Sequence, residues 1–176
     1  NSISYPRYYL DFETVSFIVP RWIGTQSFQQ IPFQYSCHVE QEDGSLSHHA
    51  FLDISGKSPI LNFIEKLIND VGNEGPILVW NQGFESSRLN DLAQMFPEYS
   101  HHIERVISRM VDLLPIYRRH YYHAEMRGSW SIKNVLPTVA PELDYDDLEV
   151  SGGQVAQEQY KKALDPDLPP EEVKVI

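Results

Sequence analysis

The chain has 176 residues, of which 41% are hydrophobic and 12% aromatic, and it carries a formal net charge of −11. This length predicts one domain with a sizeable core, and the negative charge argues against a protein that coats nucleic acid nonspecifically. No apolar run approaches the roughly 20 residues of a membrane-spanning helix, and a single cysteine, Cys37, excludes an internal disulfide framework. A reducing cytoplasm is therefore the expected compartment.

The first predicted strand, residues 5–12, is rich in strand-forming residues and runs into two acids, Asp11 and Glu13. Because side chains alternate along a strand, both carboxylates point to the same face. Two neighbouring acids repel each other unless a cation neutralises them, and Mg²⁺ and Mn²⁺ prefer carboxylate oxygens. The pattern fits either a divalent metal site or two solvated acids at a strand end.

The next segments predict a mixed sheet. The loop after the first strand carries Trp22, which either stacks on a base or covers an edge of the core. Residues 32–40 and 46–52 are predicted as strands of an antiparallel hairpin. An amphipathic helix capped at Ser58 follows, and residues 76–80 form an apolar run typical of a buried central strand. The strand–helix–strand succession predicts a parallel pairing.

Glu85 lies in the first turn of the helix predicted directly after the buried strand. Ligand-binding groups in open α/β sheets gather at strand ends of this kind, although an acid also complements the dipole at a helix N-terminus. Further helices are predicted over residues 101–110, within residues 128–137 with a stop at Pro137, and over residues 154–164. Residues 101–133 carry an excess of basic side chains, which fits either a phosphate-binding face or a solvated helix face.

Five motifs occur in order along the chain: residues 10–14 (LDFET), 32–36 (PFQYS), 81–85 (NQGFE), 111–114 (VDLL) and 128–137 (GSWSIKNVLP). Together they resemble the DEDD superfamily of 3′–5′ exonucleases, and most closely a bacterial branch classed as a domain of unknown function. The resemblance implies an α/β fold (α+β mixed), namely a ribonuclease-H-like mixed β-sheet with flanking helices. We expect this nuclease domain to cover residues 1–164, truncated at its C-terminus, with a tail at residues 165–176.

The resemblance also implies roles for individual residues. Asp11 would bridge two divalent ions, Mg²⁺ or Mn²⁺, Glu13 would help hold the ion that activates water, and Glu85 would face the second ion. Asp112 would be an auxiliary acid of the catalytic set, with a helix-start cap as its alternative role. The expected partners are DNA or RNA, with single-stranded ends as substrate, and no membrane. The candidate nucleic-acid contacts are Trp22, Asn81, Arg118, Arg119, Arg127 and Lys133.

The last motif of the superfamily, Tyr-x-x-x-Asp on a late helix, has no match in this chain. Tyr160 is followed at that spacing by Leu164, and Tyr145 and Glu149 have the spacing but lie in an acidic segment. We therefore expect the fourth carboxylate to lie outside this chain, in a longer protein with other domains, and this fragment to be inactive by itself. Two alternatives remain open: a non-catalytic ribonuclease-H-like module that binds nucleic acid or a protein, and a metal hydrolase that uses His101, His102, His120 and His123.

Overall fold

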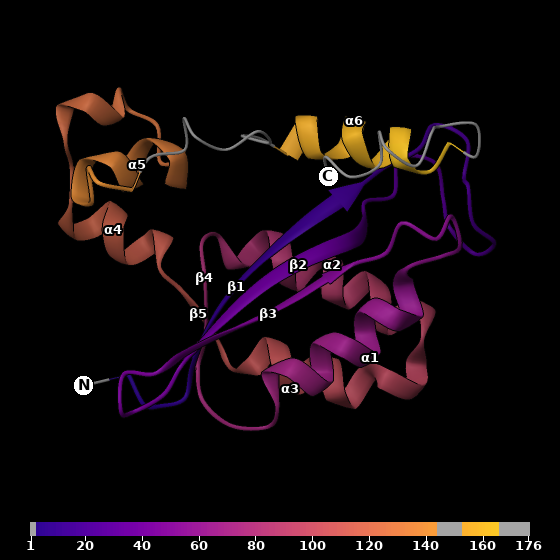
Figure 1. Cartoon of the computed structure of the whole chain (residues 1–176), viewed down its shortest axis with the longest axis horizontal. Coiled ribbons are helices and arrows are strands. Elements are labelled where there is room, and N and C mark those ends of the chain that lie inside the picture. The colour runs from indigo at the N-terminus through magenta and orange to yellow at the C-terminus, as the bar shows by residue number, and fades with distance from the viewer. Residues whose placement is uncertain (1–2, 144–152, 166–176) are drawn as a thin grey trace.

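The computed structural model describes residues 3–143 and 153–165, and within these ranges five strands form one mixed sheet (Figure 1). The strand order is β3-β2-β1-β4-β5. β2 pairs antiparallel with β1 and β3, whereas β4 pairs parallel with β1 and β5. The predicted hairpin, the parallel crossover and the mixed α/β class are confirmed. The strands are β1 (Arg7–Val15), β2 (Ile31–Glu40), β3 (Leu46–Leu52), β4 (Ile77–Val79) and β5 (Met110–Asp112).

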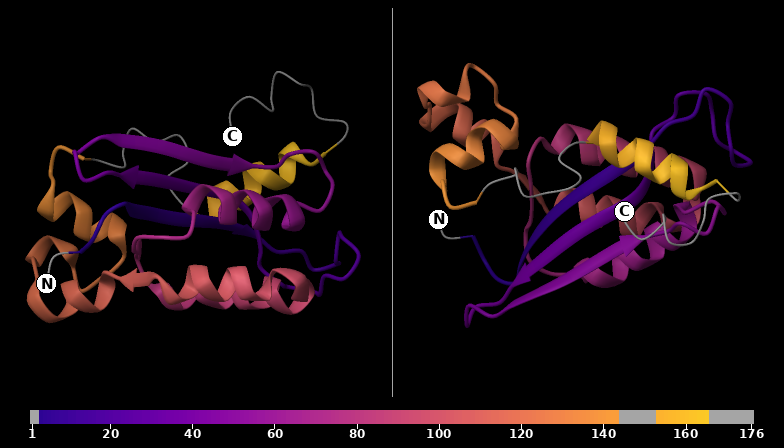
Figure 2. Two further views of the ribbon diagram at one scale, coloured as in Figure 1. Left: turned by 90° about the horizontal axis from the view of Figure 1, so that it is seen from below. Right: turned by 45° about the horizontal axis from the view of Figure 1, so that its top comes forward.

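The helices lie in separate groups around this sheet. Figure 1 draws α1 and α3 below the strands and α6 above them, and Figure 2 shows α4 and α5 together, away from α1 and α3. In the part of the chain that the structure describes, no helix has the length and apolarity to cross a membrane. The helices are α1 (Ile60–Val71), α2 (Gln82–Met95), α3 (Ser100–Ser108), α4 (Leu114–His120), α5 (Ile132–Val139) and α6 (Gly153–Ala163), with 3₁₀ turns at Pro97–Tyr99 and Ala124–Met126.

Alternation along β1 separates the core face of the sheet from its outer face. Leu10 and Phe12 are buried, and the Phe12 ring meets Phe63 of α1 edge to face, with ring centroids 5.3 Å apart. Asp11 and Glu13 therefore lie on the opposite face, because successive side chains of a strand point to opposite sides. Packing of α1 on the core face thus leaves both carboxylates on the outer face.

β1 extends beyond the predicted end, so Asp11 and Glu13 lie within the strand and not at its end. Thr14 and Val15 are buried and continue to pair with β2 across a register shift that follows Glu13. Thr and Val favour strands because branching at Cβ suits the pleated backbone. The first strand therefore continues through both acids, and the bulge beside Glu13 increases its local twist.

Three other predicted boundaries are wrong. The N-cap of α1 is Pro59 without a side-chain cap, not Ser58. Met110, predicted as the end of a helix, begins β5 because it pairs with Ile77 along the free side of β4. Pro137 lies inside α5 and does not stop it: the helix continues to Val139, and the N–H of Ala140 bonds the carbonyl of Leu136 at 2.9 Å.

A buried carboxylate, Asp70, ties α1 to the hairpin. The Tyr35 hydroxyl and the Lys66 ammonium donate to its Oδ2 at 2.6 and 2.8 Å, and the His49 ring lies 3.6 Å from its Oδ1. Burial raises the pKa of Asp70, but the bonds from Lys66 and Tyr35 outweigh it, so the net pKa falls below the usual 3.8. The charged form of Asp70 therefore stabilises the fold.

We expect Asp70→Asn to lower the free energy of unfolding by about 1–3 kcal/mol at neutral pH, because charge-assisted bonds are replaced by weaker ones. A lowered folded-state pKa gives stabilisation that is complete above the unfolded-state value and is lost as pH falls through the folded-state value. Urea unfolding from neutral to strongly acidic pH should show the difference between variant and wild type shrinking in acid. The exposed Glu104→Gln is the control, and an equal difference at every pH would contradict the assignment.

Candidate functional site

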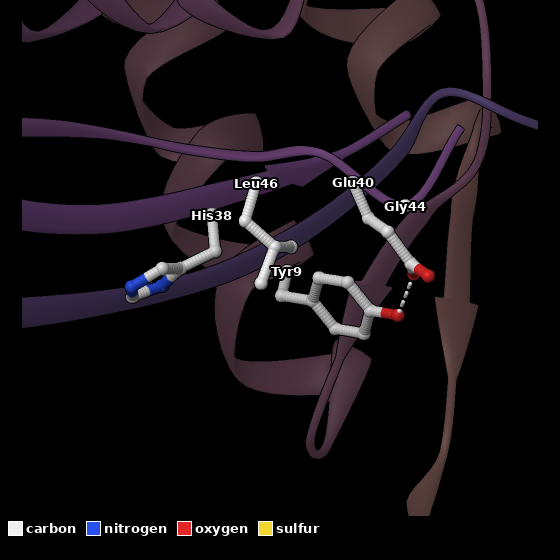
Figure 3. A pocket seen from close by; sticks show the side chains of 5 residues that line it. All are labelled: Tyr9, His38, Glu40, Gly44 and Leu46. Carbon is white, nitrogen blue, oxygen red and sulfur yellow. Dashed lines mark hydrogen bonds between the residues drawn. The ribbon is translucent and has the colours of Figure 1, made fainter. Parts of the chain in front are cut away.

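The outer face of the sheet carries mostly polar side chains around Asp11. Figure 3 shows Tyr9, His38 and Leu46 on this face, with the Tyr9 hydroxyl donating to Glu40 at 2.6 Å. Asp11 is exposed and Glu13 is half-buried, and strand register sets Asp11 opposite Ser36. This face therefore presents acceptors and aromatic edges to solvent next to the two acids of β1.

The two acids of β1 lie within electrostatic range of each other and of Lys133. Loss of hydration raises the pKa of Asp11, and the Lys133 ammonium partly opposes that rise. Loss of hydration also raises the pKa of Glu13, the charge of Asp11 raises it further, and Lys133 again lowers it. The start of α6 reaches the same place, because a Cβ on Gly153 would lie 3.2 Å from Glu13 Oε2.

Glu85 joins these acids from the first turn of α2. It is only 2% exposed, and burial together with the charges of Asp11 and Asp112 raises its pKa to about 7. Its buried Oε2 has no hydrogen-bond partner among the residues that the structure describes. A buried, unpartnered carboxylate oxygen is costly unless a proton or a cation compensates it. Binding of a proton or a cation to Glu85 would therefore stabilise the folded protein.

Asp112 supports the site through the backbone. Its carboxylate accepts the N–H groups of Asn81, Gln82 and Leu114 at 3.0, 3.1 and 3.0 Å. These bonds hold the end of β5 against the β4–α2 junction and the start of α4, although the N-cap residues of α2 and α4 are Asn81 and Leu113 and not Asp112. Asp112 thus positions the turn from which α2, and with it Glu85, begins.

The acids supply the oxygen donors that a hard divalent cation prefers, but their positions match a metal site only in part. Asp11, Glu13 and Glu85 offer carboxylate oxygens, which Mg²⁺ and Mn²⁺ prefer, and one of these oxygens is buried without a partner. Across residues 3–143 and 153–165, however, no three His, Cys, Asp or Glu side chains already form a group able to hold a metal. The three carboxylates therefore influence one another electrostatically, but the described residues do not form a complete coordination sphere.

The other predicted contact residues lie in different surroundings. Trp22 is buried, with its indole donating to the Gly56 carbonyl at 3.2 Å, which matches the core-covering alternative and leaves little ring surface for a base. Arg118 lines a cavity with Trp80 and Asn81, whereas Arg119 and Arg127 are exposed elsewhere on the surface.

Within residues 3–143 and 153–165, neither His101, His102, His120 and His123 nor Tyr160 makes a hydrogen bond, ion pair or ring contact with Asp11, Glu13 or Glu85. The rings of His101 and His102 in α3 meet edge to face, 6.0 Å apart, while His120 ends α4 and His123 follows it. Tyr160 is buried and stacks on Phe33 at 3.8 Å. Leu164 is buried as well, and Tyr145 and Glu149 lie outside the described residues.

A known protein family matches the part of the chain that carries these acids. The family described as a domain of unknown function, DUF2779, matches residues 8–131, a stretch that contains Asp11, Glu13, Glu85 and Asp112. The chain belongs to the DUF2779 family. The expected class, a domain of unknown function, is thereby confirmed.

Two curated bacterial proteins are similar to this DUF2779 chain. Uncharacterized protein UU173 of Ureaplasma parvum is 25% identical over 175 residues, which cover 88% of this chain and 25% of that protein. Uncharacterized protein MG366 of Mycoplasma genitalium is 23% identical over 180 residues, which cover 90% of this chain and 26% of that protein. The DUF2779 chain thus spans about a quarter of the length of these relatives. No solved structure matches it.

Sequence reasoning missed two aromatic residues of the DUF2779 domain that line cavities near the acids, Trp80 and Trp130. The Trp80 indole donates to the Trp130 carbonyl at 3.0 Å, which joins the end of β4 to the turn before α5. A usable signal was present, because each tryptophan lies in or beside one of the motifs that carry the family resemblance. Nothing local, however, indicated that the two segments meet.

The β4–α2 junction depends on a left-handed residue, Asn81, at φ 77°. Asn tolerates this conformation, whereas a β-branched residue there is strained by about 1–3 kcal/mol. We expect Asn81→Val to lower the thermal midpoint and Asn81→Gly to leave it nearly unchanged, in scanning calorimetry. Equal midpoints for both variants would show that the conformation of Asn81 is not a constraint on the fold.

Proposed function

We propose that this domain is the nuclease domain of a metal-dependent 3′–5′ exonuclease that hydrolyses phosphodiester bonds at single-stranded DNA or RNA ends. The observation that carries the proposal is the burial of Glu85, whose Oε2 has no hydrogen-bond partner among the described residues and whose pKa is raised by burial and, to a lesser extent, by the charge of Asp11 on β1. The mixed sheet, with β2 and β3 antiparallel and β4 and β5 parallel to β1, agrees with the ribonuclease-H-like arrangement that the motif resemblance implies.

Asp11, Glu13 and Glu85 would hold the metal ions. Two divalent ions, Mg²⁺ or Mn²⁺, would supply a hydroxide near neutral pH and positive charge for the leaving oxygen. The protein's own contribution is to hold negative charge in place: β1 fixes Asp11 and Glu13 on one face, and Asp112 fixes the start of α2. Glu85 must lose its proton to bind a cation, so affinity should rise with pH through about 7.

Activity of the whole protein is expected to need more than this chain. The described residues hold no Tyr-x-x-x-Asp pair at the acids, and the curated relatives are about four times as long as the stretch they share with it. The proposed partners are therefore single-stranded nucleic acid and further domains of the same protein. The proposed compartment is the cytoplasm, in keeping with a lone buried thiol, Cys37.

A non-catalytic ribonuclease-H-like module that binds nucleic acid or a protein partner is the second candidate. The observation that favours it is the absence, among the described residues, of three donors already grouped for a metal. Such a module would keep the acids as a remnant of the fold and use the outer sheet face for binding.

The deciding experiment is incubation of the full-length protein with a short single strand labelled at its 5′ end, with Mn²⁺ or with EDTA. Stepwise shortening from the 3′ end and release of mononucleotides, only with Mn²⁺, supports the exonuclease. Binding without shortening in either condition supports the non-catalytic module. Shortening from the 5′ end, or cleavage that persists in EDTA, contradicts the proposed mechanism.

A further inference from the structure

A cavity of about 360 Å³ lies at the junction of the end of β4, α4 and the turn before α5. This volume is at the lower end of the range for small-molecule sites and suits one planar ring system better than a larger ligand. The lining residues are Trp80, Asn81, Leu114, Arg118, Trp130, Ser131 and Ile132.

The cavity has a rigid aromatic wall. The Trp80 ring contacts Tyr117 of α4 with centroids 5.1 Å apart, and its indole N–H is bound to the Trp130 carbonyl at 3.0 Å. The Trp130 ring is half-exposed and, among the described residues, contacts no other aromatic ring. The half-exposed indole of Trp130 offers stacking surface beside the fixed ring of Trp80.

The cavity also has a cationic side, and it shares part of its wall with a second cavity that reaches Asp11. Arg118, in the last turn of α4, lines it and carries a permanent positive charge. A second cavity of about 310 Å³ shares Trp80 and Ile132 with the first and continues along the outer sheet face to Asp11. Trp80 and Ile132 therefore border both cavities, the one that holds Arg118 and Trp130 and the one that reaches Asp11.

We propose that the cavity at Trp80, Trp130 and Arg118 is a pocket for one unpaired nucleobase and its phosphate, and that it makes the domain select single-stranded over duplex nucleic acid. Stacking on an indole accepts any base, because every base has a π-face, while Arg118 binds the phosphate. A base in a duplex is stacked on both faces and paired along one edge, and therefore cannot enter the pocket. This inference rests on the proposed function only for the role of the neighbouring acids, since base binding requires no metal.

Binding is measured by fluorescence anisotropy with labelled oligothymidine in EDTA, so that cleavage plays no part. Trp130→Ala should weaken binding about tenfold, the loss typical of one stacking residue. Arg118→Gln should weaken it and lower the salt dependence by about one phosphate contact. Phe28→Ala and Lys57→Gln, an aromatic and a cationic change on other surfaces, should leave the affinity within about twofold of wild type.

The selectivity is tested with a blunt-ended DNA hairpin of the same length. Wild type should prefer the single strand, Trp130→Ala should lose most of that preference, and Trp130→Phe should restore it, because phenylalanine keeps a stacking face. Circular dichroism checks that each variant folds, and Arg118 is exposed, so Arg118→Gln remains informative if Trp130→Ala does not fold.

Unchanged affinity and preference in Trp130→Ala and Arg118→Gln would overturn the pocket. Binding that depends on Trp130 in a protein that never cleaves would support the pocket and refute the exonuclease. Affinity and preference that Trp130→Ala leaves unchanged, in a protein that does cleave, would refute the pocket alone.

Discussion

Asp11→Asn is expected to abolish metal-dependent shortening of single strands by the full-length protein while leaving the fold intact. Asparagine keeps the shape of the side chain but removes the charge that would hold both cations. Loss of several kcal/mol of metal-borne transition-state stabilisation corresponds to a fall of about 10³-fold or more in kcat/KM. Steady-state cleavage with Mn²⁺ measures this loss.

Two comparisons make the Asp11→Asn result specific. Oligothymidine affinity in EDTA should stay near wild type or improve, because the variant removes a negative charge from a groove that receives phosphates. Asp43→Asn, in the exposed turn between β2 and β3, is the matched control and should cleave as wild type does. Wild-type activity in Asp11→Asn would exclude Asp11 from the chemistry and contradict the proposed metal site on β1.

Glu85→Gln is expected to stabilise the metal-free protein above neutral pH. The folded-state pKa of Glu85 is raised from 4.5 to about 7, so the folded state holds a proton that the unfolded state has already released. Wild-type stability should therefore fall as pH rises from about 4.5 to 7, by up to about 3 kcal/mol, the cost of charging a buried carboxylate. Gln carries no charge and escapes that cost.

Thermal unfolding in EDTA across this pH range measures the effect, and at alkaline pH the midpoint of Glu85→Gln should exceed wild type by roughly 5–10 °C. The two proteins should converge in acid. Added Mn²⁺ should raise the midpoint of wild type and not of Glu85→Gln, because a ligand that binds only the native state stabilises it. If the thermal midpoints of the two proteins change with pH in parallel and respond equally to Mn²⁺, Glu85 has no raised pKa and is not a metal ligand. The exposed Glu158→Gln is the control.

Several parts of the site were predictable because they depend on local periodicity. The common face of Asp11 and Glu13 follows from strand alternation, and the place of Glu85 in the first turn of α2 follows from a buried strand succeeded by helix-forming residues. The hairpin of β2 and β3 was predictable for the same reason, since a turn signal lies between two runs of strand-forming residues.

Other features were decided by contacts between distant segments. β5 exists because β4 offers it a partner, although residues 101–110 favour a helix. Trp22 is a core residue because Gly56, remote in sequence, accepts its N–H. Asp112 is committed to the backbone of residues 81 and 82 by hydrogen bonds that no sequence spacing indicates.

By itself the amino-acid sequence determined the order of the elements, the mixed character of the sheet and the shared face of the first two acids, because each depends on neighbours a few residues apart. Only the tertiary structure decided that Glu85 is buried with an unsatisfied oxygen within the electrostatic range of Asp11, and that Trp80 and Trp130 line one cavity. The physical reason is that burial and hydrogen bonding depend on which segments pack together. Those contacts join residues as far apart as Arg21 and Leu164, which are 143 positions apart, beyond the reach of any local pattern.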